Sequence, residues 1–353
     1  MRRFVMERER IKRVNWIFLL TLGMMLLPSF LPFHYIIKNS LQNVLVSQSM
    51  IAIPGILYLI LSRQRYTEAV RLKKMSLSNI VLVILFAILI SPVMTFVNAL
   101  SMLYSTNVTT STMTSITSSV PLLVSLFAIA VVPAFIEESM YRGVFYNEYR
   151  KVNPIGAIFL SAFLFGILHG NLNQFTYAFF MGIVFALMIE ATDSILSTMI
   201  LHFLTNGTSV VILYAYPKLL SYFQTVYDNA VSSGDLNLAA QVESMLGTTT
   251  FDMNELMDQA TSAVTDTLGS VLATYGLTAL VSGILAFFVY RTIAKNTDRW
   301  DYIKNIFLHN RPDGEPPVLT AEGNKKRPSL ITIPLAIAIL YLIVNMVLAE
   351  FIM

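Results

Sequence analysis

The sequence of 353 residues contains no cysteine and few charged residues, and both shortages narrow the functions it can have. Without cysteine there is no disulfide, no thiolate metal site, no cysteine nucleophile and no lipid attached through sulfur. Charged residues make up 13% of the chain, about half the share in soluble proteins. Hydrophobic residues make up 55% and the mean hydropathy is +0.65, which indicates an integral membrane protein. We expect contact with the lipid bilayer and no nucleic-acid partner.

Apolar stretches long enough to cross a bilayer occur along most of the chain. A span needs about 20 residues, and fewer where neighbouring helices shield it from lipid. Several prolines fall inside or beside these stretches, where neighbouring helices must satisfy the freed carbonyl groups, so we expect a packed bundle. The sequence predicts an all-α fold, a polytopic transmembrane helix bundle of about nine spans, at roughly residues 15–33, 42–62, 79–101, 118–140, 154–170, 174–190, 194–216, 268–290 and 329–351.

The positions of the basic residues predict how the bundle sits in the membrane. All of the 24 Lys and Arg residues except Lys38 and Lys218 lie before the first span or in alternate segments after it. By the positive-inside rule, we expect the N-terminus in the cytoplasm, and nine spans then leave the C-terminus outside. No small-residue cleavage site follows the first apolar stretch, so we expect an uncleaved span there and not a secretory signal.

The chain divides by composition into four parts. We expect N-terminal spans in residues 1–78, a catalytic core in 79–216, an extracytoplasmic insertion in 217–267 and C-terminal spans in 268–353. Within the last part, residues 292–328 contain three prolines and a glycine in a short polar run, which predicts a turn-rich cytoplasmic linker.

The extracytoplasmic insertion is polar yet periodic. Apolar residues recur at helical spacing over residues 219–230 and again over 256–264. This pattern predicts an amphipathic cap of two or three helices. Such a cap could lie on the membrane surface, cover the bundle or bind a partner.

Two adjacent glutamates, Glu137 and Glu138, lie in the fourth predicted span, with Arg142 one turn further on. An ionised carboxylate inside a membrane is costly, so it marks a functional site by default. Glu138 and Arg142 are four residues apart, the favoured spacing for an ion pair on a helix, and Glu137 points about 100° away. We expect the pair to stabilise the site and Glu137 to face a cavity. Glu190 and Asp193, at the end of a later span, are interpreted as interfacial charges.

Two histidines and an asparagine on later spans lie at a matching depth. If the helix of Glu137 continues to about Lys151, Glu137 lies about 21 Å from the cytoplasmic end of that helix. His169 comes about 22 Å along the next span, and His202 and Asn206 come about 13 and 19 Å along the seventh. The sequence therefore predicts that all four meet at one buried level, provided that the helix is uninterrupted.

These residue types suit the hydrolysis of a carbonyl compound by water. A carboxylate in a poorly solvated site can take a proton from water and return it to a leaving amine. Histidine and asparagine donors can stabilise the oxyanion, by about 3 to 4 kcal/mol for one good donor. Alternatively, His169 and His202 with one carboxylate could hold a Zn²⁺ ion that keeps an open position for water. Taken singly, a histidine in a span usually packs as a hydrogen-bonded structural residue.

Three intact motifs follow one another on these spans. They are E-E-x-x-x-R at Glu137 to Arg142, F-x-x-x-H at Phe165 to His169 and H-x-x-x-N at His202 to Asn206. In this pattern the chain resembles the CAAX prenyl protease and bacteriocin-processing family, also called CPBP or Abi, of intramembrane metalloproteases. The resemblance covers roughly residues 80–215.

The resemblance implies an all-helical bundle whose catalytic cavity opens to the membrane and the cytoplasm. It implies that Glu137 activates water, that His169 assists it or binds metal, and that His202 and Asn206 form an oxyanion pocket. The leading hypothesis is thus an intramembrane endopeptidase that acts on a membrane-bound peptide or protein. A non-proteolytic scaffold or regulator is one alternative, and a proton-coupled transporter is another, although the chain shows no repeat between halves.

Overall fold

Helices account for almost all of the structure, a computed structural model that describes residues 2–32, 35, 37–105, 109–246, 267–309 and 328–352. No strand occurs in these ranges, as the all-α prediction requires. In chain order the helices are α1 (Arg2–Phe30), α2 (Ser40–Ser62), α3 (Tyr66–Ala69), α4 (Leu77–Ser101), α5 (Thr109–Ser119), α6 (Leu122–Leu126), η2 (Phe127–Val131), α7 (Val132–Glu138), η3 (Ser139–Tyr146), α8 (Asn147–Arg150), α9 (Pro154–Ile167), α10 (Leu172–Thr192), α11 (Ile195–Ser233), α12 (Leu236–Leu246), α14 (Leu268–Val271), η4 (Leu272–Gly276), α15 (Leu277–Asn296), α16 (Trp300–His309) and α17 (Ile333–Ile352).

Within the described ranges, 8 helices are long and apolar enough to cross a membrane, consistent with the prediction of about nine spans. The remaining predicted span is α9, an apolar helix of 14 residues. Most of its residues are buried, so neighbouring helices shield it from lipid. It packs closely on α10, because a Cβ added at Gly182 of α10 would come within 2.7 Å of the Cβ of Ala162 on α9. A helix this short is therefore tolerated inside the bundle.

The helix that carries the two glutamates is continuous from Leu122 to Arg150, as the depth argument required. Two π-helical stretches, η2 and η3, lie on either side of α7, which ends at Glu138. A π-helical turn is wider than an α-helical turn, and such turns are frequent at functional sites. The helix thus departs from regular α geometry immediately before and immediately after the segment that carries the acids.

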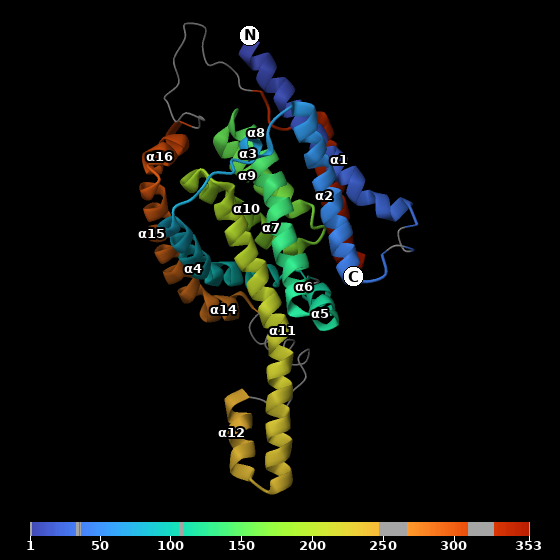
Figure 1. The fold of residues 1–353 in the computed structure, drawn as a ribbon, viewed down its shortest axis with the longest axis vertical. Helices are drawn as coiled ribbons and strands as arrows, with labels where there is room; N and C mark the ends of the chain where they lie inside the picture. The colour runs from blue at the N-terminus through green and yellow to red at the C-terminus, as the bar shows by residue number, and fades with distance from the viewer. Residues whose placement is uncertain are drawn as a thin grey trace.

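Glu190, near the end of α10, lies at the centre of a buried ion network at one end of the bundle. Its carboxylate accepts hydrogen bonds from Arg71 at 2.7 Å, from Arg150 at 3.0 Å and from Arg299 at 3.0 Å. The hydroxyl of Tyr146 donates to the same carboxylate at 3.1 Å. The three arginines come from the turn after α3, from α8 and from the turn before α16, which gather at the top of Figure 1. Glu190 therefore ties four segments together and is not the interfacial charge that the sequence suggested.

Asp193 extends this network at the α10–α11 turn, outside the spans. It accepts hydrogen bonds from Arg71, at 2.8 Å from Nε, and from Lys73. Burial alone would raise the pKa of Asp193, but the positive charges of Arg71 and Arg299 and the hydrogen bonds from Arg71 and Lys73 together outweigh it, and the pKa falls to about 2. The carboxylate therefore stays ionised and bridges the α3–α4 turn to the α10–α11 turn.

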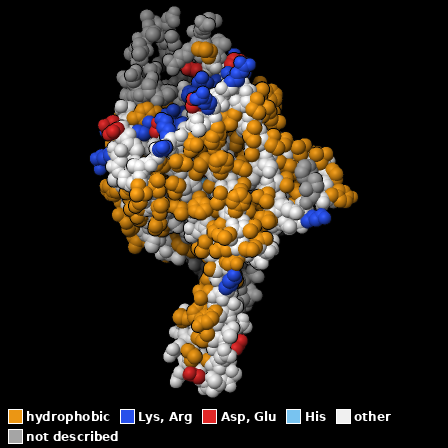
Figure 2. All heavy atoms as spheres, in the orientation of Figure 1, with side chains coloured by type: hydrophobic (Ala, Val, Ile, Leu, Met, Phe, Trp, Pro, Cys, Tyr) orange, Lys and Arg blue, Asp and Glu red, His pale blue; other side chains and the backbone are white. Residues whose placement is uncertain are grey.

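The outer surface matches a membrane environment. In Figure 2 hydrophobic side chains cover the middle of the visible face, and Lys, Arg, Asp and Glu gather near its upper end. The exposed residues of the spans include large apolar side chains, such as Leu77, Ile88 and Leu280, with relative exposures of 62% or more. These surfaces would contact lipid chains, so the chain is an integral, multi-pass membrane protein.

The insertion begins with two helices, α11 and α12. α11 continues without a break for 39 residues, about 58 Å, and is followed at Gly234 by a tight turn into α12. The two helices form a hairpin that projects away from the bundle instead of covering it (Figure 1). Helical structure over residues 219–230 is as predicted, and the stretch 256–264 lies outside the described residues. Ala230 of α11 and Ala239 and Val242 of α12 are buried, and the hydroxyl of Tyr227 donates to Glu243 at 2.8 Å, so the two helices pack against each other.

The prediction of a turn-rich linker over residues 292–328 is wrong for its first part, which is largely helical. Residues 292–296 complete α15 and residues 300–309 form α16. Ile303 and Ile306 of α16 are buried, which explains why a short helix is stable here in spite of its polar sequence. Residues 310–327 of the predicted linker lie outside the described residues.

The Glu190 network predicts a large loss of stability when its central charge is removed. Glu190→Gln should lower the free energy of unfolding by about 3 to 5 kcal/mol, because three buried or half-buried arginines lose their counter-charge. Thermal unfolding in detergent measures this loss. Asp301→Asn, at an exposed acid paired with Lys304, is the matched control and should change stability by less than about 1 kcal/mol. Equal effects of the two substitutions would contradict the structural role of Glu190.

Candidate active site

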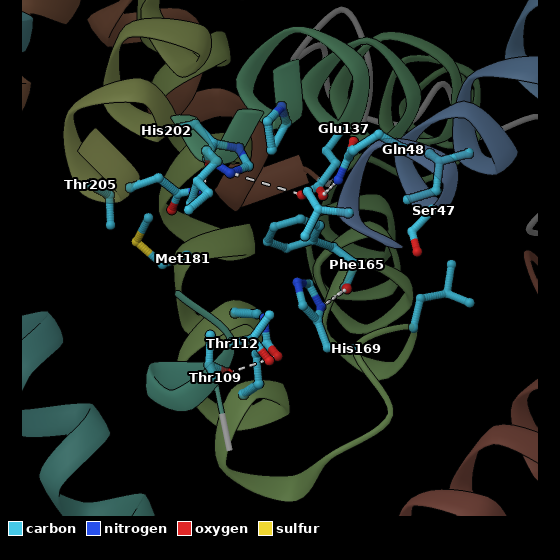
Figure 3. Close-up of a pocket in the computed structure, with 18 of the residues that line it drawn as sticks. Ser47, Gln48, Thr109, Thr112, Glu137, Phe165, His169, Met181, His202 and Thr205 are labelled. Atoms are coloured by element: carbon cyan, nitrogen blue, oxygen red, sulfur yellow. Dashed lines mark hydrogen bonds and ion pairs between the residues drawn. The ribbon is translucent and has the colours of Figure 1, made fainter. Parts of the chain in front are cut away.

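A cavity of about 410 Å³ lies within the bundle where the three sequence motifs meet (Figure 3). Its lining includes Glu137, His169, His202 and Asn206, so the structure brings together the four residues that the depth argument placed at one level. The lining comes from the continuous helix from α6 to α8, the end of α9, α10 and α11, and further lining residues come from α1, α2 and α5.

Glu137 faces the cavity and makes two polar contacts. Its Oε1 accepts a hydrogen bond of 2.6 Å from Nε2 of Gln48 on α2. Its Oε2 lies 3.8 Å from Nε2 of His202. Glu137 is 8% exposed, whereas Glu138, one residue on, is fully buried. The two neighbouring acids therefore have different surroundings, as their 100° separation on the helix predicted.

Glu138 is held by two donors from different helices. Its Oε1 accepts from Nη1 of Arg142 at 2.9 Å, which forms the predicted ion pair. The same oxygen lies 2.9 Å from Nδ1 of His202. Because a carboxylate accepts, Nδ1 carries a hydrogen and the other ring nitrogen, Nε2, is directed towards Glu137. Glu138 therefore fixes the orientation of the histidine that lines the cavity.

Aromatic rings complete the packing around Arg142. The centre of its guanidinium lies 4.4 Å from the ring centre of Phe165 and 4.9 Å from that of Phe185, so two rings contact the cation. Phe165 also makes edge contacts with His169 at 5.2 Å and with His202 at 6.0 Å. The first residue of the F-x-x-x-H motif thus packs against three of the polar side chains of the site.

His169 is oriented by its own helix end. Its Nδ1 lies 2.9 Å from the carbonyl oxygen of Phe165 and 3.2 Å from that of Gly166, at the end of α9. Carbonyl oxygens accept, so Nδ1 is the donor and Nε2 is left for the cavity. A neutral ring held in this way presents a lone pair that can accept a hydrogen from water.

Asn206 lies one turn beyond His202 on α11. Its Nδ2 donates at 3.0 Å to the carbonyl oxygen of Ile129, which belongs to the π-helical stretch η2. This bond uses one of the two amide hydrogens and fixes the side chain, so the second hydrogen remains available as a donor. The irregular helix before α7 thereby helps to place a side chain of α11.

The metal alternative would use Nε2 of His169 and of His202 together with one carboxylate. Within the described part of the chain, no group of three or more His, Asp or Glu side chains is arranged to hold a metal ion. His202 directs Nδ1 to Glu138, and His169 directs Nδ1 to backbone carbonyls, and both contacts leave Nε2 for the cavity, as in histidines that bind zinc. Zinc binding therefore stays a prediction, and the chemistry below is derived from the side chains alone.

Sequence reasoning missed two residues of this site. Gln48 lies on the second span, 89 positions before Glu137, and a single glutamine in an apolar helix carries no motif. It is, however, a polar residue in a span, the type of signal by which Glu137 itself was found. Phe185 gave no signal, because aromatic residues are common in apolar helices.

A buried carboxylate, two histidines and an asparagine thus line one cavity inside a membrane-spanning bundle. Residues 118–208 match the model of a family described as Type II CAAX prenyl endopeptidase Rce1-like. The match confirms the family resemblance drawn from the three motifs and indicates an intramembrane protease, a hydrolase, with a membrane-embedded substrate. No curated protein and no solved structure matches the chain.

The Glu138–Arg142 pair gives a prediction about stability. Arg142→Leu should lower the free energy of unfolding by about 3 to 5 kcal/mol, because it leaves a buried carboxylate without its cation. The double variant Glu138→Leu with Arg142→Leu should lose less than Arg142→Leu alone, since no uncompensated charge remains. Thermal unfolding of wild type, Arg142→Leu and the double variant in detergent tests this, and a double variant less stable than Arg142→Leu would contradict it.

Proposed function

We propose that this protein is an intramembrane endopeptidase in which Glu137 activates water to hydrolyse a peptide bond of a membrane-embedded or lipid-anchored peptide or protein. The observation that carries the proposal is the shared cavity, in which Glu137, His169, His202 and Asn206 converge from three helices. The family match over residues 118–208, which contains all four, supports the same reaction class.

In the proposed reaction, water binds between Glu137 and Nε2 of His169. Glu137 takes one proton as the water oxygen attacks the carbonyl carbon, and a tetrahedral intermediate forms. Its oxyanion is stabilised by the free amide hydrogen of Asn206 and by Nε2 of His202, in a ring that carries hydrogens on both nitrogens. Glu137 then returns its proton to the leaving amine as the carbon–nitrogen bond breaks. Glu138 and Arg142 hold the histidine and the helix in place.

The walls of the cavity suit a substrate that lies in the membrane. Apolar side chains of α1, α2 and α5 face the catalytic residues, including Met25, Val44, Ile51 and Ile116. The basic segments are concentrated at one end of the bundle, and we propose that this end and the N-terminus are cytoplasmic and that the C-terminus is outside. The α11–α12 hairpin then projects on the extracytoplasmic side, where it could contact a partner.

The first test is Glu137→Gln, which keeps the shape of the side chain and removes the base. Hydrolysis should fall by about 10²-fold to 10⁴-fold, the range of a general base, with little change in thermal stability. Glu68→Gln, at an exposed glutamate of α3 away from the cavity, is the matched control and should retain wild-type activity. A Glu137→Gln protein that hydrolyses its substrate as fast as wild type would refute the proposal.

Substrates can be found with the same pair of variants. Membrane peptides from cells that carry wild type, Glu137→Gln or Glu68→Gln are compared by mass spectrometry. New termini present with wild type and Glu68→Gln, but absent with Glu137→Gln, identify the scissile bonds. Comparison of prenylated and unmodified forms of such a peptide in detergent then shows whether a lipid anchor is required.

The proposed oxyanion donor gives a separate prediction. Asn206→Ala should lower kcat by about 10²-fold to 10³-fold with a smaller change in KM, since the lost hydrogen bond strengthens in the transition state. Thr205→Val, at the preceding residue of α11, alters a hydroxyl that donates to the carbonyl of Leu201, outside the proposed chemistry. It should change kcat less than threefold. A rise in KM alone after Asn206→Ala would assign the residue to substrate binding instead.

Two other functions make different predictions. A proton-coupled transporter would move its substrate across liposomes without cleaving it, and Glu137→Gln would stop this flux. A non-proteolytic scaffold or regulator would keep its full biological effect when His169 and His202 are both replaced. The histidines, held with defined ring nitrogens towards the cavity, favour the hydrolytic function over both.

A further inference from the structure

Gln48 is a polar side chain of α2 buried against the carboxylate of Glu137. It is 7% exposed, and its Nε2 donates to Oε1 of Glu137 at 2.6 Å, as the close-up in Figure 3 shows. α2 lies outside residues 118–208, so the contact comes from a part of the chain that the family match does not cover. The contact joins two residues that are 89 positions apart in the sequence.

The stability of the fold does not account for this glutamine. Its Oε1 is buried and has no hydrogen-bond partner among the described residues. A buried acceptor without a partner destabilises a folded protein, and inside a bundle of apolar helices an apolar side chain of similar size would avoid that cost. Within the described ranges, the bond to Glu137 is the one hydrogen bond made by the Gln48 side chain. The residue is therefore explained by what it does to that carboxylate.

α2 is held closely enough to keep this hydrogen bond short. Gly55 lies two turns along α2 from Gln48, on the same face of the helix. A Cβ there would come 2.2 Å from Sδ of Met140, which lies three residues after Glu137 on the catalytic helix. Val44 and Ile51 flank Gln48 on the same face and also line the cavity. The absence of a side chain at Gly55 lets Met140 pack directly against α2, one of the contacts that hold α2 beside the helix of Glu137.

We propose that Gln48 is a positioning residue for Glu137. Its amide holds Oε1, so that the carboxylate cannot rotate freely and Oε2 is kept towards the cavity, 3.8 Å from Nε2 of His202. A base that already has the reactive orientation loses less freedom when water is activated. This inference rests on the proposed function, because it assigns to Gln48 the orientation of the proposed base.

The test is Gln48→Met, which has a similar length and no hydrogen-bond donor. We expect kcat to fall about 10-fold to 100-fold, as for a misplaced catalytic group, with KM within twofold of wild type. The midpoint of thermal unfolding should be unchanged or higher, since the unpartnered acceptor is removed as well. Gln42→Met, at an exposed glutamine in the first turn of α2, is the matched control and should keep wild-type kcat.

A coupling measurement separates positioning from a general effect on the fold. The side chain in Glu137→Asp is shorter, so its carboxylate no longer reaches the Gln48 amide in the same way. In this background, Gln48→Met should lower the residual kcat much less than it does in wild type. Equal losses in the two backgrounds would overturn the proposal. So would wild-type kcat in Gln48→Met, or a rise in KM with kcat unchanged, which would make Gln48 a substrate contact.

The outcomes also distinguish this proposal from the proposed function. If Glu137→Gln is inactive and Gln48→Met has wild-type kcat, the positioning role fails and the hydrolytic function stands. If Glu137→Gln is active, the hydrolytic function itself fails. If Gln48→Met does not fold, Gln48→Asn replaces it in the test. This variant keeps the amide on a side chain that is one methylene group shorter. Wild-type kcat in Gln48→Asn would then overturn the positioning role.

Discussion

A charged group inside a membrane-spanning bundle has to find its partner within the bundle, because lipid supplies none. Glu190 meets this constraint with three arginines, and Glu138 meets it with Arg142 and His202. Glu137 is the exception at the site: a neutral amide and a histidine are its polar contacts, and it faces the cavity. The carboxylates that are bonded to arginine hold segments together, whereas Glu137 has no arginine or lysine partner among the described residues and faces the cavity, where it can bind water. The difference in pairing separates structural from reactive acids in one chain.

Much of the site could be predicted from the sequence because its geometry follows from helix dimensions. A fixed rise per residue places Glu137, His169, His202 and Asn206 at comparable depth once the spans are known, and helix rotation separates Glu137 from Glu138. Helix rise and helix rotation depend only on the spacing of residues along one helix, so they can be predicted from a single sequence. The number and type of the membrane helices followed in the same way from apolar stretches, and the shared cavity and the Glu138–Arg142 bond agree with these expectations.

The remainder depends on contacts between helices that are distant in the sequence. The sequence gives no reason to pair Gln48 with Glu137, and no reason to place Arg71, Arg150 and Arg299 around Glu190, which was interpreted as an interfacial charge. The direction of the insertion also depends on distant contacts, since an apolar repeat at helical spacing indicates a helix but not its direction. The helix continues outward because α11 has no break. Pro217, inside α11, does not interrupt it.

The lining of the cavity has two origins in the chain. The proposed reacting groups lie within residues 118–208, whereas further lining residues come from α1, α2 and α5, before that segment. Thr112 and Met113 of α5 shape the space beside the reacting groups, whereas Gln48 of α2 contacts Glu137 directly. Substitutions at Thr112 and Met113 therefore offer a way to retarget the cavity while the contact between Gln48 and Glu137 is kept.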